Sequence, residues 1–316
     1  MTYRFDPELA PFAPRMAPLD YGAPVDARNA LRAVMAAQPR YEPAEPVLVE
    51  DRTIPGHDGS PAVPVRLYRP ADRPGRLPAL VFPHWGGFVT GDLDTATTQA
   101  TRIAELVGAL VVSPDYRLAP EHPFPAALDD CYATLVWVAR QAHDLGVDPA
   151  RVGVGGLSAG GGLAAALALL ARDQGGPPVR HQFLLFPELD DRVGTASARA
   201  FTDTPMLDRA NLLLSWKHYL SGWSGAGVGA VSRYAAPARA EDLRGLPPAF
   251  VGVCEFDPLR DEGIDYALRL IAAGVPTDLV HYPGTFHASI GIAHAAVSRR
   301  MVADQIAVLR RELAVG

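Results

Sequence analysis

The sequence predicts an α/β protein with a mostly parallel, eight-stranded sheet that is covered by helices on both faces. Eight short runs rich in β-branched residues indicate strands. The first two runs lie close together, as in a hairpin, whereas helical patterns such as 95–108 and 125–145 separate later runs. Strands that alternate with helices are typical of parallel sheets with crossover connections. The predicted strands are 47–54, 63–68, 79–82, 110–113, 151–154, 183–186, 249–253 and 277–282.

Two segments fall outside this alternation. Residues 1–45 contain a helical stretch at 25–37 between proline-rich segments and precede every strand signal. The alternation also stops within 191–245, where a helix at 208–220 precedes the Gly/Ser/Ala-rich stretch 221–232. An insertion after the carboxyl end of a strand lies where open α/β sheets bind ligands. We therefore expect a core made of 46–190 and 246–316, with a small helical cap made of the other two segments.

The composition indicates a globular protein with a small-molecule partner. Of the 316 residues, 48% are hydrophobic and 20% are charged, which is enough apolar material for a sizeable core. The net charge of -6 and the pI of ≈ 5.8 provide no basic face, so nucleic acid and membranes are not expected as partners.

Cys131 and Cys254 are too few and too far apart for a disulfide framework. No stretch has the pattern of a secretory signal or a membrane span, and we expect a cytoplasmic location.

The strand at 151–154 leads into a G-x-S-x-G motif formed by Gly156, Ser158 and Gly160. An alanine- and leucine-rich helix follows from Leu163, which gives the strand-turn-helix context that the motif requires. Glycines around the serine allow a sharp turn that exposes its hydroxyl above a helix N-terminus. A structural glycine-rich turn is the alternative for so short a motif, and the context favours a nucleophile at Ser158.

A second glycine segment follows the strand at 79–82. Backbone amides of Gly86 and Gly87, with that of Ala159 after the serine, are candidates for an oxyanion hole. An ordinary glycine turn explains this segment equally well when it is taken by itself.

Four segments together resemble the hormone-sensitive-lipase-like branch of α/β-hydrolases, the bacterial family IV esterases. They occur in the order found in that family and span the chain from about Val47 to its end. The segment at 115–127 is much more specific than either glycine motif. The matching segments are 84–88 with 91–92, 115–127, 158–161 and 257–263.

The resemblance implies the other two members of a catalytic triad. It places the acid at Asp257, the first residue of an Asp-Pro-Leu sequence, and the base at His287. The chain order Ser, Asp, His is the one that α/β-hydrolases use. The matching His84 is expected to support the oxyanion loop by hydrogen bonding rather than to take part in the chemistry.

Other residues near these positions are alternatives for the triad. His281 lies inside a predicted strand and His294 in a helical pattern, whereas His287 lies on a loop at the catalytic end. Glu255 and Asp261 flank Asp257, and either could be the acid or a capping or solvated carboxylate. The motif favours His287 and Asp257.

The sequence departs from the family pattern beside the nucleophile and in the oxyanion segment. Trp85 stands where the family has the first of three glycines, and Leu157 stands where it commonly has a polar residue. We expect Trp85, Leu157 and the neighbouring Phe88 to shape the substrate pocket.

The predicted activity is hydrolysis of short- to medium-chain acyl esters through an acyl-enzyme intermediate, without a metal or an organic cofactor. The expected partner is a small-molecule ester. The family resemblance also implies a homodimer through the last strand and the adjoining helical stretch 292–313, although this stretch would equally pack on the sheet of a monomer. One alternative is a hydrolase or acyltransferase for a specific amide, lactone or natural-product ester. A second alternative is a non-catalytic ligand receptor on the same fold.

Overall fold

A computed structural model describes residues 3–222 and 231–313, and its described residues form one eight-stranded sheet. The strand order is β1-β2-β4-β3-β5-β6-β7-β8. β2 pairs antiparallel with β1 and with β4, and all other neighbours are parallel. The structure thus confirms the predicted hairpin and the mostly parallel sheet. The strands are β1 Val47–Ile54, β2 Val63–Pro70, β3 Leu77–Val81, β4 Leu110–Pro114, β5 Val147–Leu157, β6 Gln182–Leu185, β7 Ala249–Phe256 and β8 Thr277–Phe286.

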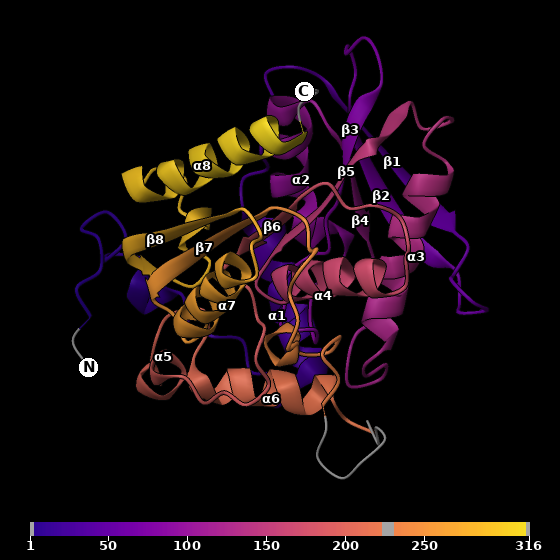
Figure 1. Ribbon diagram of the computed structural model, residues 1–316. Helices are drawn as coiled ribbons and strands as arrows, with labels where there is room; N and C mark the ends of the chain where they lie inside the picture. The colour runs from indigo at the N-terminus through magenta and orange to yellow at the C-terminus, as the bar shows by residue number, and fades with distance from the viewer. Residues whose placement is uncertain (1–2, 223–230, 314–316) are drawn as a thin grey trace.

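Helices cover both faces of the sheet. Alternate residues of a strand point to opposite faces, and in the central strands β3 and β4 the residues on both faces are buried and mostly apolar. Ala79 and Val81 of β3 belong to the apolar cluster that also contains α3, α4 and α7 side chains, whereas Leu80 belongs to the cluster with α2 and α8. Figure 1 shows α5 and α6 together along the lower edge of the molecule, on the side away from α8. The α-helices are α1 Pro24–Ala37, α2 Leu93–Val107, α3 Ala126–Arg140, α4 Ala159–Asp173, α5 Ala196–Ala200, α6 Arg209–Tyr219, α7 Arg260–Ala272 and α8 Ala296–Leu313.

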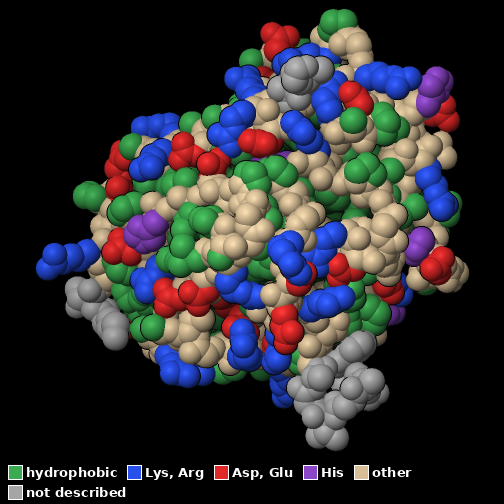
Figure 2. Space-filling model, viewed as in Figure 1, with side chains coloured by type: hydrophobic (Ala, Val, Ile, Leu, Met, Phe, Trp, Pro, Cys, Tyr) green, Lys and Arg blue, Asp and Glu red, His purple; other side chains and the backbone are tan. Residues whose placement is uncertain are grey.

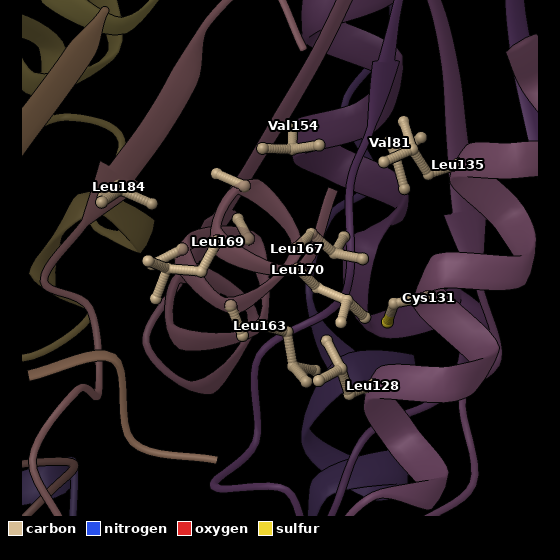
Figure 3. Packing of buried hydrophobic residues seen from close by; sticks show 14 of the residues in the cluster. Val81, Leu128, Cys131, Leu135, Val154, Leu163, Leu167, Leu169, Leu170 and Leu184 are labelled. Atoms are coloured by element: carbon tan, nitrogen blue, oxygen red, sulfur yellow. The ribbon is translucent and has the colours of Figure 1, made fainter. Parts of the chain in front are cut away.

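Helix α4 lies at the centre of the larger apolar cluster. Its residues from Ala159 to Ala171 are all buried, which suits its run of alanine, leucine and glycine. Figure 3 shows Leu163, Leu167 and Leu170 of α4 on the side that faces Leu128 and Cys131 of α3. This packing fixes the position of the N-terminus of α4 and of Ser158, the residue that precedes the helix.

The two segments outside the core alternation pack at the carboxyl end of the sheet. Tyr21 and Ala27 form a small apolar cluster with Val89, which follows β3, and Leu214 of α6 packs against it. Leu9 packs separately against Phe286 at the end of β8. The N-terminal segment and α6 therefore contact the loops that follow β3 and β8. Most of the predicted glycine-rich stretch 221–232 lies outside the described residues.

Several predicted boundaries were wrong. β5 begins at Val147, four residues before its prediction, because 141–146 form turns and not the end of the preceding helix. α4 begins at Ala159, directly after the serine, so its glycines are helical. β8 continues to Phe286, and His294 lies in a turn before α8. None of the helices in the described ranges is long and apolar enough to cross a membrane.

The surface in Figure 2 carries acidic and basic side chains interspersed with each other over the visible face. Charges of both signs on one face give no continuous positive field for a polyanion.

A buried histidine leads us to predict that the protein loses stability in mild acid. His181 is 1% exposed, and neither ring nitrogen has a hydrogen-bond partner among the described residues. Burial lowers its pKa from 6.5 to about 4. Between pH 6.5 and 4, His181 is therefore protonated in the unfolded chain but stays neutral in the folded protein. The free energy of unfolding consequently falls by about 3 kcal/mol as the pH drops from 6.5 to 4.

Denaturant unfolding at a series of pH values measures this effect. His181→Leu is expected to show a shallower acid loss than the unmodified protein, and replacement of the exposed His143 by glutamine serves as the control. An equally steep loss in His181→Leu would assign the acid sensitivity to other groups.

Candidate active site

The predicted nucleophile lies on a strained turn between a strand and a helix. Ser158 follows β5, precedes α4, and has φ 55° and ψ -126°. A Cβ atom on Gly156 would lie 2.3 Å from the backbone carbon of Gly160, so the turn leaves no space for a side chain there. Ser158 is only 5% exposed. The sequence context predicted this strand-turn-helix arrangement.

Three side chains from separate parts of the chain form a continuous hydrogen-bonded array. His287 Nε2 lies 3.0 Å from Ser158 Oγ, and His287 Nδ1 lies 2.8 Å from Asp257 Oδ2. Asp257 directly follows β7, and His287 directly follows β8. Because these parallel strands end at the same edge of the sheet, the three residues meet there. In this arrangement Nδ1–H donates to the carboxylate, which leaves Nε2 free to accept the serine proton.

Asp257 is held in its orientation by the backbone. The side chain is 0% exposed, and its Oδ1 accepts a hydrogen bond of 2.9 Å from the amide of Leu259. Both carboxylate oxygens therefore have donors, which offsets the cost of burying the charge.

The alternative residues contact other partners. Glu255 accepts from the Gly284 amide at 2.7 Å, and Asp261 accepts from the Ser197 amide at 2.7 Å. His281 is exposed on β8. The geometry therefore favours His287 and Asp257 over these rivals.

The loop after β3 contains two consecutive glycines with positive φ angles. Gly86 has φ 136°, and a Cβ there would lie 2.2 Å from the Thr90 carbonyl oxygen. Its own carbonyl accepts hydrogen bonds from the Thr90 amide at 2.9 Å and from Thr90 Oγ1 at 3.0 Å. Gly87 also has a positive φ, of 59°. In the part of the chain that the structure describes, no acceptor meets the amides of Gly86, Gly87 or Ala159.

His84 supports this loop from inside the protein. Its ring stacks on Tyr116 with centroids 4.0 Å apart, and its Nδ1–H donates to the Trp85 carbonyl at 3.0 Å. The Tyr116 hydroxyl in turn donates to the His84 carbonyl at 3.0 Å. Burial lowers the pKa of His84 to about 4, so the ring is neutral at physiological pH.

The three predicted pocket residues differ in their surroundings. Trp85 is half-buried beside the apolar cluster that contains Leu157, which is itself buried. Phe88 is buried and stacks on Tyr219 of α6, with ring centroids 4.0 Å apart. Of these three residues, Phe88 and Leu157 are therefore part of the protein interior, and only Trp85 is partly exposed at the surface.

Two cavities are present elsewhere, with volumes of about 250 and 450 Å³. Neither is lined by a triad residue. The first is lined by Asp190, Arg192, Ala238, Glu262, Asp265, Tyr266, Leu268 and Arg269, and the second by Glu241, Asp242, Leu243, Arg244, Arg269, Ala272 and Ala273.

Residues outside the sequence motifs connect the N-terminal segment to the loop after β3. Arg28 of α1 donates to the carbonyls of Val89 and Ala119, each at 2.8 Å, and pairs with Glu121. Behind the same loop, Glu188 lies buried next to Ser215 of α6. The position of Glu188 just after a predicted strand was the one sequence signal that could have identified it.

Comparison with known proteins places this site in a family. A family model described as alpha/beta hydrolase fold matches residues 80–291. The carboxylesterase NlhH of Mycobacterium tuberculosis is 44% identical over 247 residues, 78% of this chain and 76% of the relative. An ethyl acetate hydrolase of Pseudomonas putida is 33% identical over 247 residues, 77% of this chain and 76% of the relative.

A solved structure titled bacterial heroin esterase resembles the whole chain. It has a TM-score of 0.94, 44% sequence identity, and coverage of 99% of both chains. The protein belongs to the α/β-hydrolase-fold family. Within that family it is a serine carboxylesterase of the hormone-sensitive-lipase-like branch, and its fold and triad geometry agree with that class.

Proposed function

We propose that the protein hydrolyses esters by two-step acyl transfer with Ser158 as the nucleophile, His287 as the general base and Asp257 as the orienting acid. The observation that carries this proposal is the array in which His287 lies 3.0 Å from Ser158 Oγ and 2.8 Å from Asp257. Ser158 Oγ attacks the ester carbonyl carbon while His287 Nε2 takes its proton. Asp257 stabilises the imidazolium that this transfer creates.

The imidazolium of His287 then protonates the leaving alcohol as the ester C–O bond breaks, and the acyl group remains on Ser158. A water molecule attacks this acyl-enzyme and gives a proton to His287. Return of that proton to Ser158 Oγ releases the carboxylic acid and restores the enzyme.

We assign the oxyanion hole to the amides of Gly86, Gly87 and Ala159. The positive φ values of the two glycines and the absence of an acceptor for these amides among the described residues support the assignment. Ala159 adds the positive end of the α4 dipole. Each such donor typically contributes about 10²- to 10³-fold in turnover.

Residues 1–45 and 191–245 form, in our proposal, a cap over this site. The contacts of Tyr21 and Leu214 with Val89 support it, because Val89 belongs to the loop that carries the oxyanion donors. We place Trp85 at the wall of the substrate pocket and give Phe88 and Leu157 supporting positions behind it. A triad this deeply buried under a cap favours soluble substrates over emulsions.

Short- to medium-chain acyl esters are the substrates that we propose. The name of the relative from Pseudomonas putida, ethyl acetate hydrolase, supports an acyl group of this size. A series of p-nitrophenyl esters from acetyl to dodecanoyl tests the proposal. We expect kcat/KM to be greatest between acetyl and hexanoyl, and to fall roughly tenfold or more for the longest chains because their added methylenes exceed the pocket.

Two results would contradict this substrate class. Higher turnover of long-chain emulsions than of soluble short esters would place the protein among lipases. Faster cleavage of amides or lactones than of the simple esters would favour the specialised hydrolase or acyltransferase.

We also propose a cytoplasmic location and a homodimer. Two buried free thiols, Cys131 and Cys254, agree with a reducing compartment. β8 is an edge strand, and an edge strand can pair with the same strand of a second copy.

A further inference from the structure

A buried glutamate follows β6 close to the nucleophile turn and has no part in the triad. Glu188 follows β6 and is 1% exposed. Its backbone amide donates to the Ser158 carbonyl at 3.1 Å, which places residue 188 next to the nucleophile turn. Its side chain contacts Ser215 of α6, which in turn contacts the carbonyl of Gly87 in the loop after β3.

The hydrogen bonds around Ser215 require a proton on Glu188. Ser215 Oγ lies 2.9 Å from the Gly87 carbonyl oxygen and 2.6 Å from Glu188 Oε1. A carbonyl can only accept, and a serine hydroxyl has only one proton to donate. Both contacts are hydrogen bonds at the same time only when Ser215 donates to Gly87 and Glu188 donates to Ser215. An ionised Glu188 would instead compete with the Gly87 carbonyl for the single serine proton.

The surroundings of Glu188 favour its neutral form. Burial and, to a smaller extent, the negative charge of Asp257 together raise the pKa of Glu188 to about 8, against the lowering effect of Ser215. No cationic side chain in the described ranges contributes to this shift. The titratable groups that interact with Glu188 are Tyr21 before α1, Tyr116 after β4, Tyr219 on α6, Asp257 after β7 and Glu262 on α7.

We propose that Glu188 is a positioning residue for the oxyanion loop, whose protonated carboxyl donates to Ser215 so that Ser215 holds the Gly87 carbonyl. This inference rests on the proposed function, because it takes the Gly86 and Gly87 amides as oxyanion donors. The carbonyl that Ser215 holds belongs to the peptide unit immediately after the Gly87 amide. Ionisation of Glu188 removes this restraint, so kcat falls at alkaline pH.

The test is the pH dependence of kcat and KM for p-nitrophenyl acetate, measured from neutral to alkaline pH. We expect kcat of the unmodified protein to fall about tenfold through a pH near 8, with little change in KM. Glu188→Gln carries an amide that donates to Ser215 at every pH and cannot ionise, so it should lose the alkaline fall. At pH 9 it should therefore be faster than the unmodified protein.

Ser215→Ala is the second variant, and it keeps the proposal testable if Glu188→Gln does not fold. It removes the donor to Gly87 at every pH, so we expect kcat to be about tenfold lower at neutral pH and nearly independent of alkaline pH. Ser221→Ala is the matched control, since Ser221 follows the same helix and donates only to the His218 carbonyl. It should behave like the unmodified protein.

The outcomes distinguish failure of this inference from failure of the proposed function. An unchanged alkaline fall in Glu188→Gln or in Ser215→Ala would overturn the inference. A uniform loss of kcat in Glu188→Gln at all pH values would also overturn it, because the carboxylate form would then be the one required. Activity that survives in Ser158→Ala would refute the proposed nucleophile, whereas an inactive Ser158→Ala with an unaltered Glu188→Gln profile would refute only the role of Glu188.

Discussion

Replacement of Ser158 by alanine is expected to lower kcat for p-nitrophenyl acetate by about 10⁶-fold. The variant lacks the Oγ atom that lies 3.0 Å from His287 Nε2, so neither the covalent step nor the proton transfer can occur. Alanine can occupy the φ of 55° at the same steric cost as serine, and the fold should therefore be kept. The residual rate should come only from binding and the oxyanion donors.

A matched control separates loss of the nucleophile from loss of a buried hydroxyl. Ser113 of β4 is fully buried, and its Oγ has no partner in the described part of the chain. Ser113→Ala should therefore leave both kcat and stability nearly unchanged. A phosphonate ester inhibitor should add its mass to the unmodified protein and to Ser113→Ala, but not to Ser158→Ala. Labelling of Ser158→Ala at the same rate would show that another residue is the nucleophile.

The sheet could be predicted from the sequence because each of its strands carries a local signal. Buried parallel strands consist of short β-branched runs, and all eight predicted runs overlap the observed strands. The ends of the strands were less predictable where backbone pairing with a neighbouring strand, and not the type of side chain, determines them. The additional residues 283–286 of β8 include Pro283 and Gly284, which propensity assigns to a loop, yet Phe286 still pairs with Phe256 of β7.

The triad positions were predicted because each residue belongs to a short motif at the end of a strand. Glu188 and Ser215 have no such motif, and 27 residues separate them in the chain. Their meeting depends on how α6 packs against the loop after β3, which is a tertiary contact with no local pattern. The same holds for Arg28, whose partners lie 61 to 93 residues away.

Replacement of Asp257 by asparagine is expected to lower kcat by about 10⁴-fold while leaving KM and the fold nearly unchanged. The Oδ1 atom that accepts from the Leu259 amide is expected to remain in place, so the new amide nitrogen faces His287 Nδ1. That nitrogen is a donor, and it forces the tautomer in which Nε2 carries the proton. The histidine can then no longer accept the proton of Ser158. The variant also lacks the negative charge that stabilises the imidazolium.

Glu255→Gln and Asp261→Asn are the controls for this assignment, because both carboxylates lie within four residues of Asp257. Glutamine at 255 can still accept from the Gly284 amide, and asparagine at 261 can still accept from the Ser197 amide. Each control should therefore keep kcat within about tenfold of the unmodified protein, since it affects only a supporting hydrogen bond. A loss of about 10⁴-fold in either control, together with a modest loss in Asp257→Asn, would transfer the role of the acid to that neighbour. Because all three changes remove one negative charge from the same short segment, 255–261, a difference among them reports the contact with His287 and not the local charge.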